Sequence, residues 1–312
     1  MCYSAQIKAD YKRFVREYGA VMSLDAFSRL VTEYFQNPGS VKFPKAMAAP
    51  FLESPETEEE KKIADVLRAS MEAEEIRLLQ ELAKQTERLE NAQASLAAKP
   101  TKKAADEVRI ASNKIAWAKG KLEDLKSTEI KPRDSRIFPG WYAPVMVWEN
   151  GRRVVKPMRY QCRPAGKPAF YDTKYPSTYN ARMDNLRGFW KGQYGHTHGV
   201  VLVDAFYENV AGPEGKNIVL EFRPAPPQTM LVACVWSHWR ATKPGEQDLL
   251  SFAIITTDPP PAISEAGHDR CPVPIKPEDL DAWLNPDPND LDAMDEILRD
   301  NGMPRFVHSV AG

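Results

Sequence analysis

The chain has 312 residues, 43% of them hydrophobic and 27% charged, with 42 lysines and arginines against 43 aspartates and glutamates. This apolar content is close to the globular average and excludes a disordered chain, and the length suits one large domain or two ordinary ones. The formal net charge of −1 argues against a protein held to nucleic acid by bulk positive charge, because such proteins usually have a high pI.

The four cysteines lie far apart in the sequence and form no CxxC pair, so neither a disulfide framework nor a zinc finger is expected. The first residues carry charge by position 8 and lack the apolar core of a secretory signal. No stretch approaches the roughly 18 apolar residues of a membrane span. We therefore expect a cytoplasmic protein with no membrane segment, no metal and no cofactor.

Apolar residues recur at helical spacing between residues 5 and 36, which predicts a helical region there. The following stretch, NPGSVKFPKAMAAPF, is interrupted by proline and glycine and should be irregular. From Ser54 to about Ser127 the composition changes to glutamate, lysine, alanine, leucine and glutamine, which is typical of long helices.

Two apolar stripes in this segment are separated by Lys99-Pro100 and predict an antiparallel helical hairpin, whose longer arm would reach about 60 Å. The first stripe comprises Ile63, Leu67, Met71, Leu78, Leu82 and Leu89, and the second Val108, Ile115, Leu122 and Leu125. The hairpin could simply pack on itself in solvent, or it could be an arm that binds a protein partner.

Beyond residue 137 short runs of β-branched and aromatic residues alternate with turns. Asn150-Gly151 predicts a β-hairpin, and the acidic tail predicts two short helices. The pattern predicts an α+β fold around curved, mainly antiparallel sheets with an inserted helical hairpin. We expect residues 1–53 and 131–312 to form one compact domain and residues 54–130 to form the insertion.

Cys2 is the first candidate for chemistry. Removal of Met1 would leave one residue with both an α-amine, of reference pKa about 7.7–8.0, and a thiol, of reference pKa about 8.5. Such a 1,2-aminothiol can capture an aldehyde as a Schiff base and close it to a thiazolidine ring. Taken alone, a cysteine at position 2 could equally be an ordinary buried thiol.

Further segments carry a family resemblance when they are taken in order. Met1-Cys2 is followed by Tyr142-Ala143-Pro144, the MRYQCRP segment from Met158, and Asn180-Ala181-Arg182. The strand VLVDAFYEN with Glu208, the strand FAIITT, GHDRCPV with His268, and KPEDLDAWL complete the series. This order over residues 1–36 and 137–290 resembles the SRAP (SOS response-associated peptidase) family, whose members crosslink to abasic sites in single-stranded DNA.

The resemblance implies a compact mixed domain and a covalent mechanism. It implies Cys2, Asn180, Glu208 and His268 as catalytic residues, with Arg182 as a phosphate contact. It also implies that Cys2 joins the opened sugar aldehyde of an abasic site and that the linked protein, held at the nucleoid while on DNA, shields the lesion in the DNA damage response.

The residue types are compatible with these roles. Glu208 follows an apolar strand, so desolvation could favour proton exchange with the amine. An imidazole at His268 could help to open the sugar ring, the Asn180 amide could orient the amine, and Arg182 offers a planar fork suited to phosphate. Each could instead be an ordinary strand-end, loop, turn or surface residue.

Charge is distributed unevenly along the chain. The stretch from Gly151 to Lys191 contains ten lysines and arginines but only two acidic residues, Asp172 and Asp184. Aromatic residues are interleaved with the basic ones. Basic groups beside aromatic faces suit single-stranded DNA. The predicted DNA contacts are Arg182, Arg159, Arg163, Tyr160 and Arg187, although a solvated basic face over a core of aromatic residues would give the same pattern.

The sequence also departs from the family pattern. Tyr3 and Ser4 follow Cys2 where many members have Gly-Arg, which removes a possible phosphate contact beside the nucleophile. His196 and His198 share a strand face, but no acidic residue or cysteine stands at ligand spacing, so no metal site is predicted.

Two alternative functions remain open at this point. Cys2 could serve a peptidase or amidase that removes Met1 autocatalytically. The protein could also be a non-catalytic repair adaptor that acts through the helical hairpin.

Overall fold

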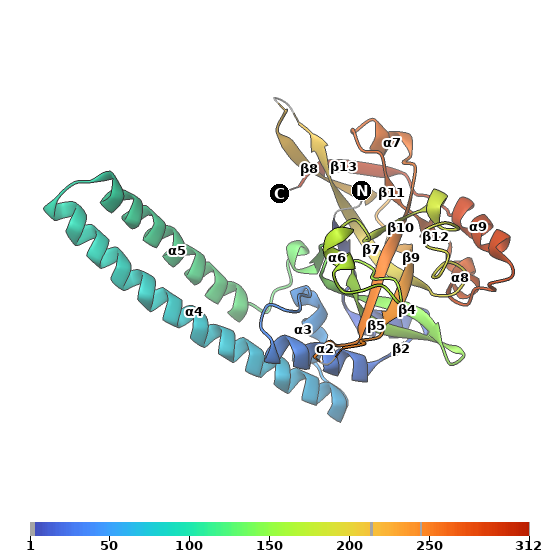
Figure 1. The fold of residues 1–312 in the computed structure, drawn as a ribbon, viewed down its shortest axis with the longest axis horizontal. Coiled ribbons are helices and arrows are strands. Elements are labelled where there is room, and N and C mark those ends of the chain that lie inside the picture. Colours follow the sequence, from blue (N-terminus) through green and yellow to red (C-terminus); the bar gives the residue numbers. More distant parts are fainter. Residues whose placement is uncertain (1–3, 213–214, 244, 312) are drawn as a thin grey trace. The chain divides into compact units, whose positions relative to one another are not determined.

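A computed structural model describes residues 4–212, 215–243 and 245–311, and the chain divides into two compact units. Residues 1–54 and 130–312 form the first unit, called the core unit below, and residues 55–129 form the second. The core unit is a strand-rich domain with helices around it, and the second unit is a pair of long antiparallel helices (Figure 1). The predicted α+β class with an inserted helical hairpin is confirmed.

The centre of the core unit is a closed ring of five strands. These are β4 (Tyr142–Glu149), β5 (Arg152–Tyr160), β7 (His198–Ala211), β9 (Met230–Trp239) and β10 (Leu249–Thr257). The ring closes because β9 pairs with β10 on one edge and with β7 on the other, while β10–β5–β4–β7 completes the circuit. All of these pairings are antiparallel except that of β10 with β5.

The ring begins with the predicted hairpin. β4 and β5 are joined by Asn150 and Gly151, which have φ values of 52° and 77°. Positive φ at both central residues is the requirement of a type I′ turn, and asparagine and glycine meet it with least strain. The prediction of a hairpin at this dipeptide is therefore confirmed.

Short strands extend the ring at its margins. They are β1 (Ser4–Ile7), β2 (Val21–Met22), β3 (Arg136–Ile137), β6 (Asn180–Arg182), β8 (Asn217–Pro224), β11 (Cys271–Pro272), β12 (Pro274–Ile275) and β13 (Phe306–Val310). β1 lies between β7 and β3, and β6 runs parallel to β10. These short strands bring residues from both ends of the chain to the same sheet.

The N-terminal region differs from the prediction in three places. Residues 5–7 belong to strand β1, Val21 and Met22 form strand β2, and the helical part consists of α1 (Tyr11–Tyr18) and α2 (Leu24–Gln36). The stretch expected to be irregular contains α3 (Lys45–Glu53), with Pro50 inside it. Burial explains this helix, because Met47 and Phe51 are one turn apart and are 2% and 1% exposed.

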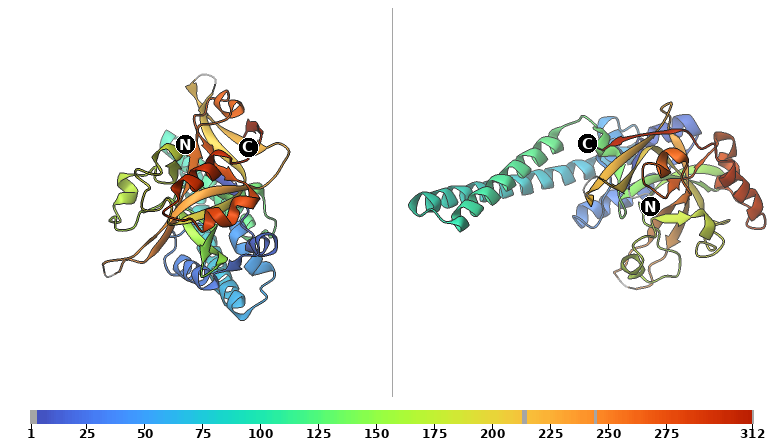
Figure 2. Two further views of the ribbon diagram at one scale, coloured as in Figure 1. Left: turned by 90° about the vertical axis from the view of Figure 1, so that its right-hand side faces the viewer. Right: turned by 90° about the horizontal axis from the view of Figure 1, so that it is seen from above.

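The two helices predicted in the tail are present as α8 (Leu280–Leu284) and α9 (Leu291–Arg299), which lie near each other in Figure 1. Figure 2 gives two further views of the same ribbon. α8 contacts β4 and β7, and α9 contacts β12. Their apolar side chains join a continuous core in which Trp283 is completely buried, and the Trp283 indole N–H donates to the Gly199 carbonyl at 2.9 Å. The acidic tail is therefore part of the folded core unit.

The second unit contains α4 (Glu58–Ala98) and α5 (Lys102–Lys126). A capping box begins α4, since Glu60 N donates to Thr57 Oγ1 at 3.1 Å and Thr57 N donates to the Glu60 carboxylate at 3.4 Å. A second threonine, Thr101, caps α5 by accepting from Ala104 N at 3.1 Å.

The seam between the two helices has a seven-residue period, as in a coiled coil. Its buried positions are Leu78, Gln85 and Ala92 on α4 and Ala104, Ala111 and Ala118 on α5. Most of the leucines and β-branched residues of the predicted stripes are only half buried, as at Leu82, Leu89, Val108 and Ile115. Alanine occupies the α5 side of the seam, where small side chains let the two helices approach closely.

Candidate active site

Glu208 is a buried carboxylate near the end of β7. Its side chain is 1% exposed. β7 is paired in this region with β1 on one edge and with β8 on the other. Ser4 pairs with Tyr207, and Glu208 itself pairs with Leu220. A carboxylate removed from water in this way needs a specific partner to be tolerated.

That partner is His268, which lies in the loop between α7 (Pro261–Ser264) and β11. The His268 Nε2 atom lies 3.0 Å from Glu208 Oε2, and the two side chains are 8% and 1% exposed. The Nδ1 atom is 3.0 Å from the Arg270 carbonyl oxygen and 3.2 Å from the Arg270 amide nitrogen. The structure thus joins two residues that are sixty positions apart in the sequence.

This arrangement satisfies the imidazole in either protonation state. When neutral with the proton on Nε2, the His268 ring donates to Glu208 and accepts from the Arg270 N–H. When protonated, it donates to Glu208 and to the Arg270 carbonyl. A buried carboxylate in direct contact with an imidazole is an arrangement suited to general acid–base chemistry.

Cys271 lies close to this pair but is not suited to act as a nucleophile. Burial, and next the nearby charge of Glu208, raise the pKa of the Cys271 thiol far above its usual value. The thiolate is the reactive form of cysteine, so Cys271 stays protonated and inert near neutral pH. Burial raises the pKa of Cys162 to about 12 in the same way, and also raises that of Cys234.

Asn180 begins β6, which runs alongside β10 with Asn180 opposite Ile254. Both polar atoms of its amide, Oδ1 and Nδ2, are buried and lack a hydrogen-bond partner within the part of the chain that the structure describes. Nearly all buried polar atoms in proteins are hydrogen-bonded, so an amide left in this state points to a group that is supplied by a ligand.

The end of β10 connects Asn180 with the loop that carries His268. Thr256 of β10 pairs with Arg182 of β6 and also with Pro272 of β11. Thr256 is 1% exposed, and its hydroxyl has no hydrogen-bond partner among the residues described. The sequence FAIITT did not distinguish Thr256 as a candidate site residue. Thr256 becomes one only because β10 pairs there with both β6 and β11.

Arg182 is exposed at the end of β6 and forms an ion pair with Asp184, two residues further along the chain. Its Nη2 and Nε atoms donate to the Asp184 carboxylate at 2.7 and 3.0 Å. This hydrogen bond, with further help from Asp258 and Asp269, raises the pKa of Arg182 above its ordinary value. The guanidinium remains exposed and can exchange this exposed carboxylate for another anion, because surface pairs of this kind are weak.

Cys2, the predicted nucleophile, lies outside the described residues. The first described residue, Ser4, is completely buried in β1, directly beside the residue that precedes Glu208. The Ser4 hydroxyl accepts from Arg136 Nη2 at 2.8 Å and Nε at 3.0 Å, and the Arg136 guanidinium lies 3.7 Å from the centre of the Tyr207 ring. Arg136 thus places a positive charge at this end of β1, which sequence reasoning missed because it lies outside every motif.

Three of the predicted DNA contacts, Tyr160, Arg159 and Arg163, lie mainly in the interior of the core unit. Tyr160 is fully buried, with its ring 5.2 Å from that of Phe252, so it cannot offer a face to a base. Arg163 is 9% exposed and shares the Asp172 carboxylate with Arg159, at 2.5 and 2.8 Å respectively. Burial alone would raise the pKa of Asp172, but hydrogen bonds from the two arginines lower it overall.

Arg187 is exposed and is engaged by the acidic tail, with Asp295 Oδ2 at 2.7 Å and a very short contact to Asp292. The uneven distribution of charge along the sequence is thus partly cancelled in space, because the acidic tail folds back on the basic stretch. Of the five predicted DNA contacts, Arg182 and Arg187 have exposed guanidinium groups, at 48% and 50% of the side chain.

The two histidines of His196-Thr197-His198 differ in environment. His198 is 1% exposed and stacks on Trp283 with ring centres 3.9 Å apart. Its Nε2 accepts from Gly195 N at 2.8 Å, and its Nδ1 lies 3.0 Å from the Trp283 carbonyl. Both ring nitrogens are therefore used within the core. Among the residues described, no group of three or more histidine, cysteine or acidic side chains could hold a metal ion.

The fold and the site together define a mixed α/β domain with a buried carboxylate–imidazole pair beside its N-terminal strand. A family model described as SOS response associated peptidase (SRAP) matches residues 68–309. Because this match covers most of the chain, the protein belongs to the SRAP family, a family connected with DNA through the SOS response. The match begins beyond the segment that contains Cys2.

Three of the solved structures that match the chain show limited similarity to it. A protein from Bordetella bronchiseptica is 19% identical, with a TM-score of 0.47 over 60% of this chain and 90% of its own. A protein from Bacteroides thetaiotaomicron is 16% identical, with a TM-score of 0.48 over 57% of this chain and 78% of its own. A phage-related protein from Bordetella bronchiseptica is 21% identical, with a TM-score of 0.43 over 60% of this chain and 85% of its own.

No curated protein matches the chain significantly. In the described part of the chain, no helix is both long enough and apolar enough to cross a membrane.

Proposed function

We propose that the protein captures abasic sites in single-stranded DNA as a covalent thiazolidine on Cys2, after removal of Met1. The α-amine adds to the sugar aldehyde to give a carbinolamine, which loses one water to form an imine. The Cys2 thiol then adds across the C=N bond and its proton passes to the nitrogen. Aldehyde, amine and thiol thus combine with the net loss of one water, and no oxidant or cofactor is required.

The position of Ser4 beside the buried acid–base pair is the observation that carries this proposal. Two residues of chain span at most about 7 Å, so the Cys2 Cα is tethered within that distance of the Ser4 Cα. Ser4 pairs with the residue that precedes Glu208. A nucleophile tethered there needs a nearby group that can accept and return a proton at each addition and at the loss of water, and the pair of Glu208 and His268 can provide it.

The buried amide of Asn180 and the hydroxyl of Thr256 supply the polar groups that would hold the sugar. Both lack a hydrogen-bond partner within the described residues, and both belong to the paired strands β6 and β10. Arg182 on the same short strand would exchange Asp184 for a DNA phosphate. The DNA contacts proposed for this site are therefore Asn180, Thr256 and Arg182, with Arg187 as an outer contact.

The test is a denaturing gel of the full chain mixed with a single-stranded oligonucleotide that contains one abasic site. A shifted band is expected, and its intact mass should equal that of the protein without Met1 plus the oligonucleotide minus one water. Cys2→Ala should abolish the band, and Glu208→Gln should slow its appearance by about 10²- to 10⁴-fold. Glu149→Gln, which changes a half-exposed carboxylate in the β4–β5 hairpin, is the matched control and should crosslink normally.

Absence of any band with the native protein, or a full band with Cys2→Ala, would contradict the proposal. A peptidase reaction by the same site has its own readout, which is the mass of the N-terminus in purified protein. If Cys2→Ala and Glu208→Ala both retain Met1 while Glu149→Ala loses it, removal is autocatalytic. If all three lose Met1, a separate aminopeptidase removes it and the autocatalytic alternative is excluded.

A further inference from the structure

The helical hairpin has opposite charge at its two ends. Between residues 55 and 83 nine acidic residues stand against four basic ones. Between Lys84 and Lys121 nine basic residues stand against four acidic ones. The second stretch forms the distal end of the hairpin, where α4 turns into α5. A chain with a net charge of −1 therefore carries a local excess of five positive charges on this end.

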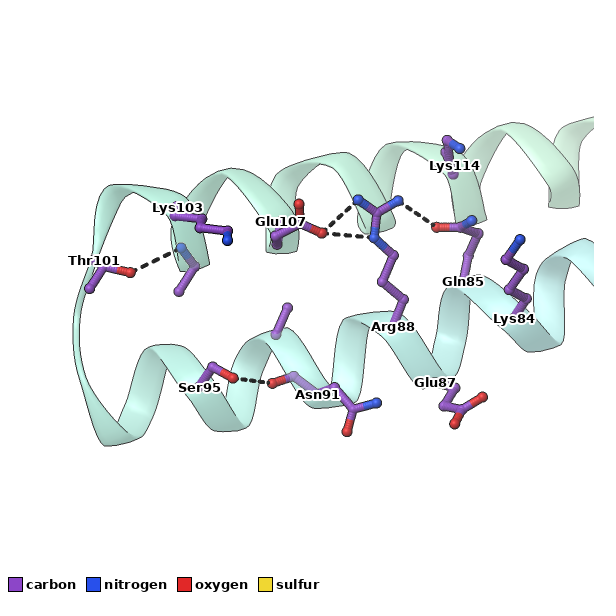
Figure 3. Close-up of a pocket in the computed structure, with 12 residues that line it drawn as sticks. Lys84, Gln85, Glu87, Arg88, Asn91, Ser95, Thr101, Lys103, Glu107 and Lys114 are labelled. Carbon is purple, nitrogen blue, oxygen red and sulfur yellow. Dashed lines mark hydrogen bonds and ion pairs between the residues drawn. The ribbon is translucent and has the colours of Figure 1, made fainter.

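Part of this charge surrounds a cavity of about 710 Å³ between the two helices (Figure 3). The side chains of Lys84 and Arg88 extend from α4 towards α5. Lys103 and Lys114 of α5 also line the cavity. Arg88 is held by Glu107, with Nη2–Oε2 at 2.6 Å. Within the described part of the chain no ion pair is found for any of the three lysines. Their charge is therefore available to an external anion.

An exposed indole continues the same face of α5. Trp117 lies three residues after Lys114 and four before Lys121, so the three side chains are neighbours on the helix surface. The Trp117 side chain is 48% exposed, in contrast to the completely buried Trp283. It contributes nothing to the seam, which is occupied by alanine on α5. An indole flanked by lysines has the composition of a surface on which nucleic acid bases stack.

We propose that the distal face of the hairpin, defined by Lys84, Arg88, Lys103, Lys114, Trp117 and Lys121, binds single-stranded nucleic acid non-covalently. The lysines contact phosphates, Arg88 lies beside them while paired with Glu107, and Trp117 stacks on a base. From Lys103 to Lys121 the face extends about 27 Å along α5, which is enough for several successive phosphates of one strand. The apolar area is a single indole among cations, which favours a polyanion with stackable faces over a protein partner.

This binding does not depend on the chemistry of Cys2, so it is measured with an oligonucleotide that contains no abasic site. Fluorescence anisotropy of a labelled single strand is followed with the full chain over a range of salt concentrations. The triple variant K84A/K103A/K114A removes three charges from the face. The matched control K102A/R109A/K119A removes three charges from α5 residues that do not line the cavity.

K84A/K103A/K114A should bind more weakly than the native protein. The slope of its plot of log affinity against log salt concentration should be smaller in magnitude by about 2, because each of three lost phosphate contacts contributes about 0.7 for a single strand. The control variant should keep the slope of the native protein. Trp117→Ala should weaken binding by about 5- to 150-fold, while Trp117→Phe retains a stacking face and should lose less. Circular dichroism shows whether each variant keeps its helices.

Equal losses in the two triple variants would overturn the assignment to this face, because general positive charge would then account for binding. Unchanged affinity in Trp117→Ala, or preferential binding of duplex, would overturn the stacking contact. The endpoint of covalent capture of abasic DNA distinguishes the two proposals. Cys2→Ala should keep the anisotropy signal, and K84A/K103A/K114A should still reach the full crosslink at saturating DNA.

Discussion

His198 should make the core unit sensitive to acid in a way that one substitution can isolate. Because a backbone N–H donates to Nε2, the neutral ring carries its proton on Nδ1 and donates it to the Trp283 carbonyl. Burial lowers the pKa of His198 to about 3 from an ordinary value of 6.5. Protonation of Nε2 would set two N–H groups against each other inside a stack of rings, so the folded state resists it.

The size and sign of the effect follow from proton binding in the two states. The unfolded chain takes up a proton near pH 6.5, while the folded chain does not until about pH 3. The stabilising contribution is complete above pH 6.5 and is lost as pH falls towards 3, at about 1.4 kcal/mol per pH unit. Between pH 7.5 and 4.5 the native protein should therefore lose on the order of 2–3 kcal/mol from this residue alone.

Urea unfolding of native protein and His198→Gln at several pH values measures this contribution. Glutamine can still accept from Gly195 N but does not titrate, so the variant should be less stable at pH 7.5 by about 1–3 kcal/mol. That difference should shrink or reverse by pH 4.5. His196→Gln, at an exposed position two residues earlier, is the control and should follow the native protein. A difference between native protein and His198→Gln that stays constant from pH 7.5 to 4.5 would refute the reasoning.

Three further predictions concern the core unit. Asp172→Asn should lower the free energy of unfolding by about 3 kcal/mol or more, because it leaves two largely buried arginines without their shared carboxylate. Asp184→Asn, which breaks an exposed pair, should change the free energy of unfolding far less, and chemical denaturation compares the two variants. Gly199→Ala should cost about 1–3 kcal/mol, since its Cβ would lie 2.9 Å from a buried valine methyl, and an unchanged melting temperature would contradict this. Glu208→Gln should leave the melting temperature within a few degrees of native while slowing capture of abasic DNA, and a variant that is unfolded by circular dichroism would show instead that the carboxylate is needed for folding.

The sequence predicted those elements whose signal is local. Asn150-Gly151 predicted its hairpin because few residue pairs adopt positive φ at two successive positions, as this turn requires. The long helices were recognisable from composition. Strand β1 was missed because four residues, Ser4–Ile7, carry no periodicity of their own and become a strand only between β7 and β3. The closed ring depends on the pairing of β9 with β7, which no local pattern encodes.

The sequence could nominate candidate site residues but could not indicate their contacts. The order of short motifs pointed to Asn180, Glu208 and His268, and the structure places the latter two 3.0 Å apart. Nothing in the sequence could show that Tyr160 would be buried, since a tyrosine in a basic stretch suits a DNA surface and a core equally well. Contacts between residues far apart in the sequence determine whether such a tyrosine is buried. Contacts of the same kind bring Asp295 of the acidic tail to Arg187.

The points at which the hairpin leaves and rejoins the core unit have a consequence for the cost of the insertion. Ser54 and Ile130 line one pocket of the core unit, although 75 residues separate them. Ser54 is fixed there, because Lys12 Nζ donates to its carbonyl at 2.6 Å. Ends held side by side make the cost of a long insertion small, since loop-closure entropy grows only slowly with length. The length of the segment inserted between these two points should therefore have little effect on the stability of the core unit.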